Sequence, residues 1–217
     1  MPNFLNIEEV ASRVGGLVPR AGRRAVLIGI SGIDGSGKGY VSARLAADLR
    51  STEKRVAVIG IDDWHAPAKQ RRHAVPPGIA FYEAGLRLIE CFFRVVRPLA
   101  RDGAVRFEAD AIGPDGRSWR KVHEHGPVDV VIFEGVFIFR RDLRPEFDLA
   151  AWIECSYETA LARAITRNQE CLAEDAIRRD YAEIYFPAQR HHASLDQPRD
   201  GADVVVANDP QIGPSPA

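Results

Sequence analysis

The sequence predicts an α/β protein, a three-layer sandwich in which helices cover both faces of a central, mostly parallel β-sheet. Two observations favour this fold class. Short apolar runs rich in branched residues alternate with segments of helical periodicity, and such alternation is typical of parallel sheets. Each run is apolar at consecutive rather than alternate positions, which is expected of strands buried on both faces.

Five runs have the composition of buried strands, and they cover residues 25–31, 55–61, 128–133, 149–154 and 202–208. Helices are predicted at 7–14, from 41 to 49, at about 81–100, at 157–167 and over most of 168–192. Pro98 is expected to bend or end the long helix of 81–100. Residues 105–107 and the region around Trp119 are predicted to form a short hairpin across the turn at 113–116.

The length of 217 residues suits one domain with a well-buried sheet. We assign residues 1–24 to a leader helix and linker, 25–208 to the α/β domain and 209–217 to a flexible tail. The formal net charge of −1 gives no general attraction to nucleic acid or to an anionic membrane. No apolar segment is long enough to span a bilayer, and the three cysteines lack a CxxC pair. We therefore expect a cytoplasmic protein without nucleic-acid or membrane partners.

A glycine-rich segment follows the first predicted strand and precedes a predicted helix. Residues 32–38 read GIDGSGK, which fits the P-loop pattern G-x-x-x-x-G-K. Glycines allow successive backbone amides to face one phosphate group, and the lysine adds a positive charge. The pattern predicts a P-loop NTPase fold that binds ATP and Mg²⁺. The expected nucleotide-binding residues are Gly32, Ile33, Asp34, Gly35, Ser36, Gly37, Lys38, Gly39 and Tyr40.

Gly39 departs from the pattern, which has Ser or Thr after the lysine to ligate Mg²⁺. A glycine offers no side-chain oxygen, although a water molecule can occupy the vacant coordination position. Two interpretations follow. One is an active enzyme with altered metal coordination, which we favour, and the other is a nucleotide-binding protein with little catalysis.

Acidic residues follow two further strands. Asp62 and Asp63 end the second strand, and Glu134 ends the third. Ligands of parallel sheets bind outside the carboxyl ends of the strands, so these acids are expected near the P-loop. A functional acid at this position orients an attacking hydroxyl or holds Mg²⁺. The alternative interpretation is an acid that caps a helix or is solvated in a loop.

Basic and aromatic residues complete the candidate set. Arg163 and Arg167 share a helix face and are candidates to contact transferring phosphates, and a solvated basic face is the alternative. Arg71 and Arg72 pose the same choice. His65 is expected to line an acceptor pocket. Trp64, Phe81 and Tyr82 are able to stack on a planar substrate, with core packing as the default.

The chain resembles the uridine kinase-like branch of P-loop kinases, which includes phosphoribulokinase and type I pantothenate kinase. The resemblance covers about residues 25–208. It rests on five segments: GISGIDGSGKG at 29–39, IDDWHAP at 61–67, DVVIFEGVFIF at 129–139, ETALARAITRN at 158–168 and GADVVVAN at 201–208.

The resemblance implies roles for individual residues. Lys38 is similar to the phosphate-binding lysine, Asp62 to the base that accepts the acceptor's proton, and Glu134, together with Asp62, to the magnesium site. Arg163 and Arg167 resemble arginines that approach the phosphates from a lid, here about residues 168–180. The substrate-binding residues implied by position are Asp63, His65, Phe81, Tyr82, Asp110 and Arg117.

The predicted function is transfer of the γ-phosphoryl group of ATP to an alcohol on a small molecule, with uridine or cytidine as the first guess. The segment 76–81 lacks the acid with which nucleoside kinases of this branch hold the sugar hydroxyls. A pantothenate-like, sugar or sugar-phosphate acceptor is therefore an alternative, and an ATP-binding regulator with weak catalysis is a second. The resemblance also makes a homo-oligomer an expectation.

Overall fold

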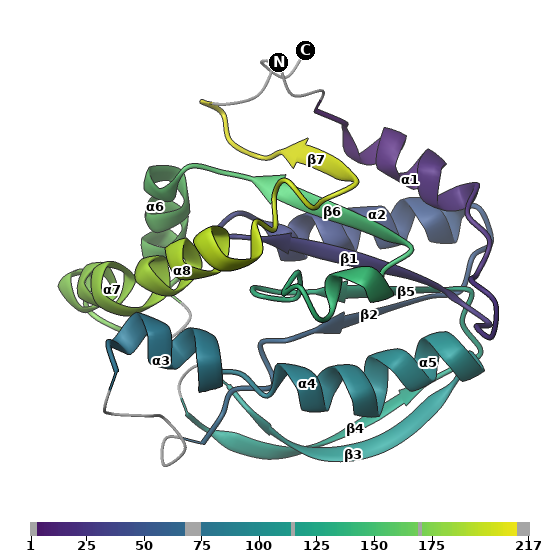
Figure 1. The fold of residues 1–217 in the computed structure, drawn as a ribbon, viewed down its shortest axis with the longest axis horizontal. Coiled ribbons are helices and arrows are strands. Elements are labelled where there is room, and N and C mark those ends of the chain that lie inside the picture. The colour runs from purple at the N-terminus through teal and green to yellow at the C-terminus, as the bar shows by residue number, and fades with distance from the viewer. Residues whose placement is uncertain (1–3, 68–74, 114–115, 169–170, 212–217) are drawn as a thin grey trace.

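The computed structural model describes residues 4–67, 75–113, 116–168 and 171–211. Its centre is a parallel sheet of five strands in the order β2-β5-β1-β6-β7 (Figure 1). The strands are β1 (Val26–Gly32), β2 (Val56–Gly60), β5 (Val130–Glu134), β6 (Leu149–Glu154) and β7 (Val204–Ala207). Each corresponds to one of the five predicted runs, so the predicted fold class is confirmed.

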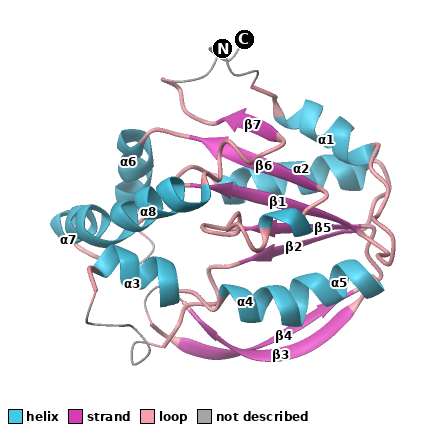
Figure 2. Ribbon diagram, viewed as in Figure 1, coloured by secondary structure: helices cyan, strands magenta, loops and turns pink. Residues whose placement is uncertain are grey.

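Helices cover both faces of the sheet and complete the three layers (Figure 2). On one face, α1 (Ile7–Gly15) and α2 (Lys38–Ser51) pack Val10, Val14 and Leu45 against β1. Phe92, Val95 and Val96 pack against the other face together with Phe133. Since both faces are covered, the strands are apolar at successive positions, as predicted.

The predicted helix at 81–100 is wrong in its boundaries. The structure has α3 (Pro77–Ala84), then α4 (Leu88–Cys91), the π-helical turn η2 (Phe92–Val96) and α5 (Arg97–Asp102). The chain leaves the helix at Gly85 because residues 85–87 pair with 64–66. Pro98 does not end the helix. In the wider turn before it, the Arg97 amide bonds to the Phe92 carbonyl, five residues back, which makes room for the proline ring.

The predicted hairpin is present and longer than expected. Strands β3 (Val105–Ile112) and β4 (Ser118–His125) pair antiparallel over their whole lengths. The C-terminal region contains the 3₁₀ turn η3 (Arg144–Glu146), α6 (Tyr157–Arg167), α7 (Glu174–Asp180), the π-helical turn η4 (Tyr181–Tyr185) and α8 (Phe186–Asp196). Helix α6 has the predicted bounds. In the described residues, no helix is both long enough and apolar enough to cross a membrane.

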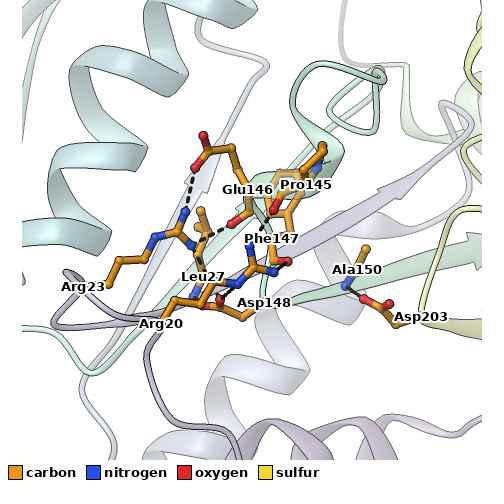
Figure 3. Close-up of polar contacts among 9 residues, drawn as sticks. All are labelled: Arg20, Arg23, Leu27, Pro145, Glu146, Phe147, Asp148, Ala150 and Asp203. Carbon is orange, nitrogen blue, oxygen red and sulfur yellow. Dashed lines mark hydrogen bonds and ion pairs between the residues drawn. The ribbon is translucent and has the colours of Figure 1, made fainter.

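Two carboxylates, the buried one of Asp148 and the exposed one of Asp203, hold backbone amides at the starts of the strands (Figure 3). Asp148 accepts a hydrogen bond from the Leu27 amide at 2.7 Å, and its own amide bonds to the Leu27 carbonyl. Its other oxygen lies 2.6 Å from Arg20 Nε. Asp203 holds the Ala150 amide in the same manner at 2.7 Å. The Asp148 carboxylate thus joins the N-terminal linker to the edge of β6.

We expect Asp148→Ala to lower the free energy of unfolding by about 2–4 kcal/mol, because it leaves a buried amide and a guanidinium without their acceptor. Chemical denaturation measures the change. Glu174→Ala, which removes an exposed i,i+4 partner of Arg178, is the control and should cost about 0.5 kcal/mol. Equal losses in the two variants would contradict the role given to Asp148.

Candidate functional site

The loop of residues 32–37 connects β1 to α2 and adopts a conformation that only glycine permits at two positions. Gly35 has φ +78° and Gly37 has φ +89°. A Cβ atom at Gly35 would lie 2.4 Å from the Ala160 carbonyl oxygen, and one at Gly37 would lie 2.2 Å from Asn208 Nδ2. Both positions therefore require glycine for two reasons, the positive φ and the lack of room for a Cβ atom. The loop opens at the N-terminus of α2, where backbone amides are available to an anion.

Two side chains from distant elements hold this loop in place. Asn208, just after β7, donates from Nδ2 to the Ser36 carbonyl at 2.7 Å. Arg163 on α6 donates from one guanidinium nitrogen to the same carbonyl at 3.3 Å and to the Asn208 carbonyl at 2.9 Å. Arg163 therefore contacts the back of the loop in this structure. Nothing in the sequence singles out Asn208 for this role, since a polar residue after a strand is common in any loop.

Lys38 is the first residue of α2 and is 8% exposed. Its Nζ donates to the Ile33 carbonyl at 2.9 Å and so closes the loop. The ammonium also interacts electrostatically with Asp62 and Glu134. The three charges come from three neighbouring segments of the sheet, as the sequence predicted from their places at strand ends.

Glu134 lies between the other two charged segments because β5 is the strand between β1 and β2. It is in register with Ile30 of β1 and Gly60 of β2. Its carbonyl accepts from the Ile61 amide at 3.1 Å, which places the residue before Asp62 beside it. The P-loop, Asp62 and Glu134 are thereby brought together at one edge of the sheet.

Both carboxyl groups have raised pKa values. Burial raises the pKa of Glu134 to about 7, and the Lys38 ammonium opposes this shift while the Asp62 carboxylate adds to it. Desolvation likewise raises the pKa of Asp62, with Lys38 again opposing. The Asp62 side chain is accessible to solvent, but the walls of a concave site surround it and remove much of its hydration.

From the raised pKa of Glu134 we predict how the stability of the nucleotide-free protein depends on pH. The folded value of about 7 exceeds the ordinary value of 4.5, so the folded state binds more protons between these limits. Stability therefore falls as pH rises through this window. Glu134→Gln removes the penalty, and we expect its advantage in unfolding free energy over wild type to grow from pH 5 to pH 8, up to about 3 kcal/mol. Denaturant titrations at several pH values measure it, with Asp142→Asn on an exposed loop as control. A constant difference across pH would contradict the shift.

A cavity lies beside Asp62 and is covered by the C-terminal helices. We call it the central cavity. Its walls include Asp34, Asp62, His65, Phe81, Leu86, Val136, Ala164, Arg167, Asn168, Leu172, Ile177, Asp180, Tyr181, Tyr185 and Gln189. Three of the predicted site residues, Asp62, His65 and Phe81, line this one cavity. The cavity has a volume of about 80 Å³ and is partly open to solvent.

Arg167 lines both the central cavity and a second, shallower pocket on α6. That pocket, which we call the α6 pocket, also contains Glu158, Thr159, Ala162, Arg163, Thr166 and Gln211. The Arg167 guanidinium lies 3.7 Å from the Asp34 carboxylate, which also accepts a hydrogen bond from the Tyr181 hydroxyl. The P-loop, α6 and η4 therefore meet at Asp34, and Arg167 is positioned between the two pockets.

Several residues of the central cavity were missed by the sequence analysis. Gln189 on α8 is 4% exposed, and its Oε1 has no hydrogen-bond partner among the described residues. Tyr181 and Tyr185 come from η4. The sequence predicted only a polar, largely helical segment here. The packing of α8 against α3 decides which face of this segment turns inward.

Other predicted substrate residues lie elsewhere in the structure. Tyr82 is buried, and its hydroxyl donates to Asp196 at 2.5 Å, so it packs in the core rather than in the central cavity. Asp63 pairs with Lys121, and the Asp110 carboxylate pairs with Arg120 at 3.2 Å on the exposed face of β3. Arg117 is exposed beyond the hairpin turn. Arg71 and Arg72 lie outside the described residues.

The two residues after Lys38 face solvent. Tyr40 is 64% exposed, and a Cβ atom at Gly39 would have no neighbouring atom within 4 Å. Crowding therefore does not explain the missing hydroxyl at position 39. Trp64, in contrast, is 1% exposed, and its ring lies beside the Arg87 guanidinium and the His123 ring. This burial agrees with the core-packing alternative.

The arrangement fits ATP and Mg²⁺. The glycine-lined loop offers amides and Lys38 an ammonium for phosphates, while Asp62 and Glu134 offer carboxylate oxygens. In the described residues, no cluster of three or more His, Cys, Asp and Glu side chains forms a complete metal site. Mg²⁺ commonly takes one or two protein carboxylates and completes its shell with phosphate and water oxygens.

The fold and the phosphate loop together define a P-loop protein with the fold of uridine kinase-like kinases. A family model for the methylmalonyl-CoA mutase-associated GTPase MeaB matches residues 8–69, which include the P-loop. No curated protein sequence has significant similarity to the chain.

Three solved structures place this fold among kinases. A candidate fructose transport system kinase from Silicibacter sp. TM1040 has a TM-score of 0.73 at 23% identity, covering 93% of this chain and 98% of that one. A possible uridine kinase from Bacillus stearothermophilus has a TM-score of 0.71 at 18% identity, with coverages of 92% and 96%. The D-glycerate 3-kinase of Cryptococcus neoformans has a TM-score of 0.58 at 15% identity, with coverages of 95% and 94%.

Proposed function

We propose that this protein transfers the γ-phosphoryl group of ATP to an alcohol group of an uncharged small molecule, with uridine or cytidine as the first candidates. The observation that carries the proposal is the position of Asp62. It lines the central cavity, and it is electrostatically coupled to the P-loop lysine, Lys38. An acid between an acceptor cavity and a phosphate loop suits phosphoryl transfer to a hydroxyl.

In this proposal each charged residue has a distinct task. The amides of residues 32–38 and the Lys38 ammonium hold the β- and γ-phosphates. Asp62 accepts a hydrogen bond from the acceptor hydroxyl and orients it for in-line attack on the γ-phosphorus. As the new P–O bond forms, the bond from that phosphorus to the β,γ-bridging oxygen breaks and ADP leaves, while Asp62 takes the hydroxyl proton. Arg167, which borders both pockets, stabilises the negative charge of the group in transfer, while Arg163 holds the loop.

Glu134 and Asp62 would hold Mg²⁺, which when bound offsets the negative charge of the phosphate oxygens. The raised pKa of Glu134 is consistent with this role, since the carboxyl is poorly solvated until a cation is present to compensate it. The nucleotide base and ribose would lie in the α6 pocket, on the opposite side of Arg167 from the central cavity.

The central cavity supports an uncharged acceptor. Its described walls carry the acids Asp34, Asp62 and Asp180 against the single cation Arg167, which disfavours a phosphate or carboxylate. Phe81, with the tyrosines of η4, offers aromatic surface to a planar ring. Gln189 lines the same cavity, and its side-chain amide would offer a hydrogen-bonding group to that ring.

A binding panel tests the acceptor. Uridine, cytidine, fructose, glycerate, pantothenate and ribose 5-phosphate would each be titrated into the protein by calorimetry, with a non-hydrolysable ATP analogue present, and then assayed for ADP formation. We expect a nucleoside to bind and to be phosphorylated, and Gln189→Leu to weaken that binding about tenfold. Selective use of an anionic acceptor would refute the uncharged class. Fructose and glycerate are included because two of the similar structures bear their names.

A second candidate function is nucleotide binding with little phosphoryl transfer, which Gly39 and the partial match to a GTPase family model both favour. Tight binding of ATP or GTP without turnover on any acceptor of the panel would support it. Phosphoryl transfer at ordinary Mg²⁺ concentrations would eliminate it.

Gly39 itself gives a separate prediction. Because there is open space at this position, Gly39→Thr should fold normally and restore a hydroxyl at the helix start. We expect the Mg²⁺ concentration for half-maximal activity to fall about tenfold, the effect of one added ligand. Gly39→Val has the same shape without the oxygen and is the matched control. If the two variants behave alike, metal ligation is not limited by the missing hydroxyl.

A further inference from the structure

The hairpin of β3 and β4 has one edge that is paired and one that is open. At the end of β3, the Ile112 amide donates to the Asp63 carbonyl at 2.9 Å, and the Ile112 carbonyl accepts from the His65 amide at 3.1 Å. β3 therefore lies between this segment and β4, and β4 pairs with no second strand among the described residues. The hairpin forms the lower border of the molecule in Figure 1, below α4 and α5.

The hydrogen bonds at the end of the hairpin show which residues of β4 have free backbone groups. Facing residues of an antiparallel pair alternate between pairs that exchange backbone hydrogen bonds and pairs that do not. Ile112 directs its amide and carbonyl away from β4, so its pair with Ser118 is of the second kind. The next pair, Gly113 and Arg117, is joined by a hydrogen bond of 3.0 Å, which agrees. Since the register is continuous, the even-numbered residues of β4 direct their amides and carbonyls to the open edge.

The side chains at these even-numbered positions are exposed on the outer face of the hairpin. Ser118, Arg120, Val122 and Glu124 are all exposed, whereas His123 is buried. Val122 is apolar and 47% exposed, and it lies between an arginine and a glutamate on the same face. The open edge thus carries an apolar centre with one positive and one negative charge on either side.

From this edge we propose that β4 pairs antiparallel with β4 of a second copy of this chain, about a two-fold axis at Val122. Free amides meet free carbonyls only where even-numbered residues face even-numbered residues. With the axis at Val122, Arg120 lies opposite the partner's Glu124, and Glu124 lies opposite the partner's Arg120. The contact is the same on both chains and forms about six backbone hydrogen bonds.

Charge selects this register over the neighbouring ones, because like charges directly opposite each other are destabilising. An axis at Lys121 would set two lysines against each other. An axis at Arg120 or at Glu124 would likewise oppose two arginines or two glutamates. An axis at His123 would set Val122 against a glutamate. The axis at Val122 is therefore favoured, since it pairs opposite charges on both sides.

The pairing also extends ion pairs that are present within the hairpin. Arg106 of β3 lies 3.8 Å from Glu124, and Arg120 lies 3.2 Å from Asp110. Across the two chains, one row of the outer face would read Arg106, Glu124, the partner's Arg120 and the partner's Asp110, with alternating charges. Exposed ion pairs contribute little affinity individually, and their effect is to select the partner and the register.

The expected dimer is weak and independent of catalysis. One strand from each chain makes a small interface, and small interfaces are typical of transient complexes. We expect a dissociation constant of about 10–100 µM. Dimer formation requires no phosphoryl transfer, so it holds or fails separately from the kinase activity.

Sedimentation velocity at about 5–500 µM protein measures the association. Val122→Lys places two ammonium groups at the axis and should raise the dissociation constant at least about tenfold. The residue opposite Val122 on β3 of the same chain is Glu108, so the added charge is compatible with the folded hairpin. Val122→Thr keeps a neutral, β-branched side chain there and should dimerise like wild type.

A charge exchange tests the register. Arg120→Glu and Glu124→Arg each oppose like charges in a homodimer, so each alone should be monomeric at concentrations where wild type dimerises. Mixed together, the two variants oppose unlike charges at both positions and should form a heterodimer. Arg44→Glu, the same change on α2, should dimerise like wild type.

Thermal unfolding verifies that each variant is folded, and Val122→Lys decides the outcome if a charge-exchange variant is not. The proposal is overturned if wild type remains monomeric at about 500 µM. It is also overturned if Val122→Lys dimerises as wild type does, or if the two folded charge-exchange variants do not associate when mixed.

Discussion

Lys38→Met is expected to weaken ATP binding by about 10- to 100-fold and to reduce phosphoryl transfer by at least about 100-fold. The reason is the position of the ammonium. It lies at the N-terminus of α2, 8% exposed, where it closes the loop of residues 32–37 through the Ile33 carbonyl. Methionine keeps the length and packing of the side chain but removes the charge, so the phosphates would lose a charge-assisted hydrogen bond in a poorly solvated site. Calorimetric titration with ATP, followed by a turnover assay, measures both effects.

The control for this experiment is Arg44→Met on the same helix. Arg44 is exposed, and within the part of the chain that the structure describes it pairs only with Asp48 one turn away, at 3.2 Å, so its loss should leave nucleotide binding unchanged. Circular dichroism and thermal unfolding would verify that both variants are folded. If folded Lys38→Met bound ATP as tightly as wild type, the loop would not be a phosphate site, and the kinase proposal would fail with it.

Asp62→Asn is expected to lower kcat by about 100- to 10,000-fold while changing the affinity for ATP in the absence of Mg²⁺ less than about threefold. The amide retains the size of the side chain and a hydrogen-bond acceptor, but it cannot take the proton of the acceptor hydroxyl. The carboxyl of Asp62 lines the central cavity and has a raised pKa because the site desolvates it. Single-turnover kinetics with cytidine or uridine would separate the chemical step from binding.

Asp63→Asn provides the comparison for the neighbouring acid. Asp63 pairs with Lys121 of β4 and does not line the central cavity, so we expect a loss of activity below about tenfold. Equal losses of turnover and ATP affinity in Asp62→Asn would mean that this carboxylate supports the loop structurally. A larger effect at Asp63 than at Asp62 would move the proposed base to the adjacent position.

Much of the fold was predictable because its signals are local. The five strands are continuous apolar runs, and the spacing of glycines with Lys38 is a local requirement of the phosphate loop. Asp62 and Glu134 were predictable for a topological reason: parallel strands place their carboxyl ends at one edge of the sheet. The helix at 81–100 was mispredicted because strand-like pairing of residues 85–87 with 64–66 depends on contacts distant in the sequence.

The sequence by itself determined the α/β class, the phosphate loop and the two acids at neighbouring strand ends, since residue type and local spacing are sufficient for each. Only the tertiary structure decided which side chains enclose the central cavity and the α6 pocket. Gln189 and His192 lie three residues apart on one helix, so both turn inward, and nothing in their local sequence distinguishes them from solvated helix residues. Asn208 and Tyr82 acquired their partners in the same way, from segments brought together by the packing of helices on the sheet.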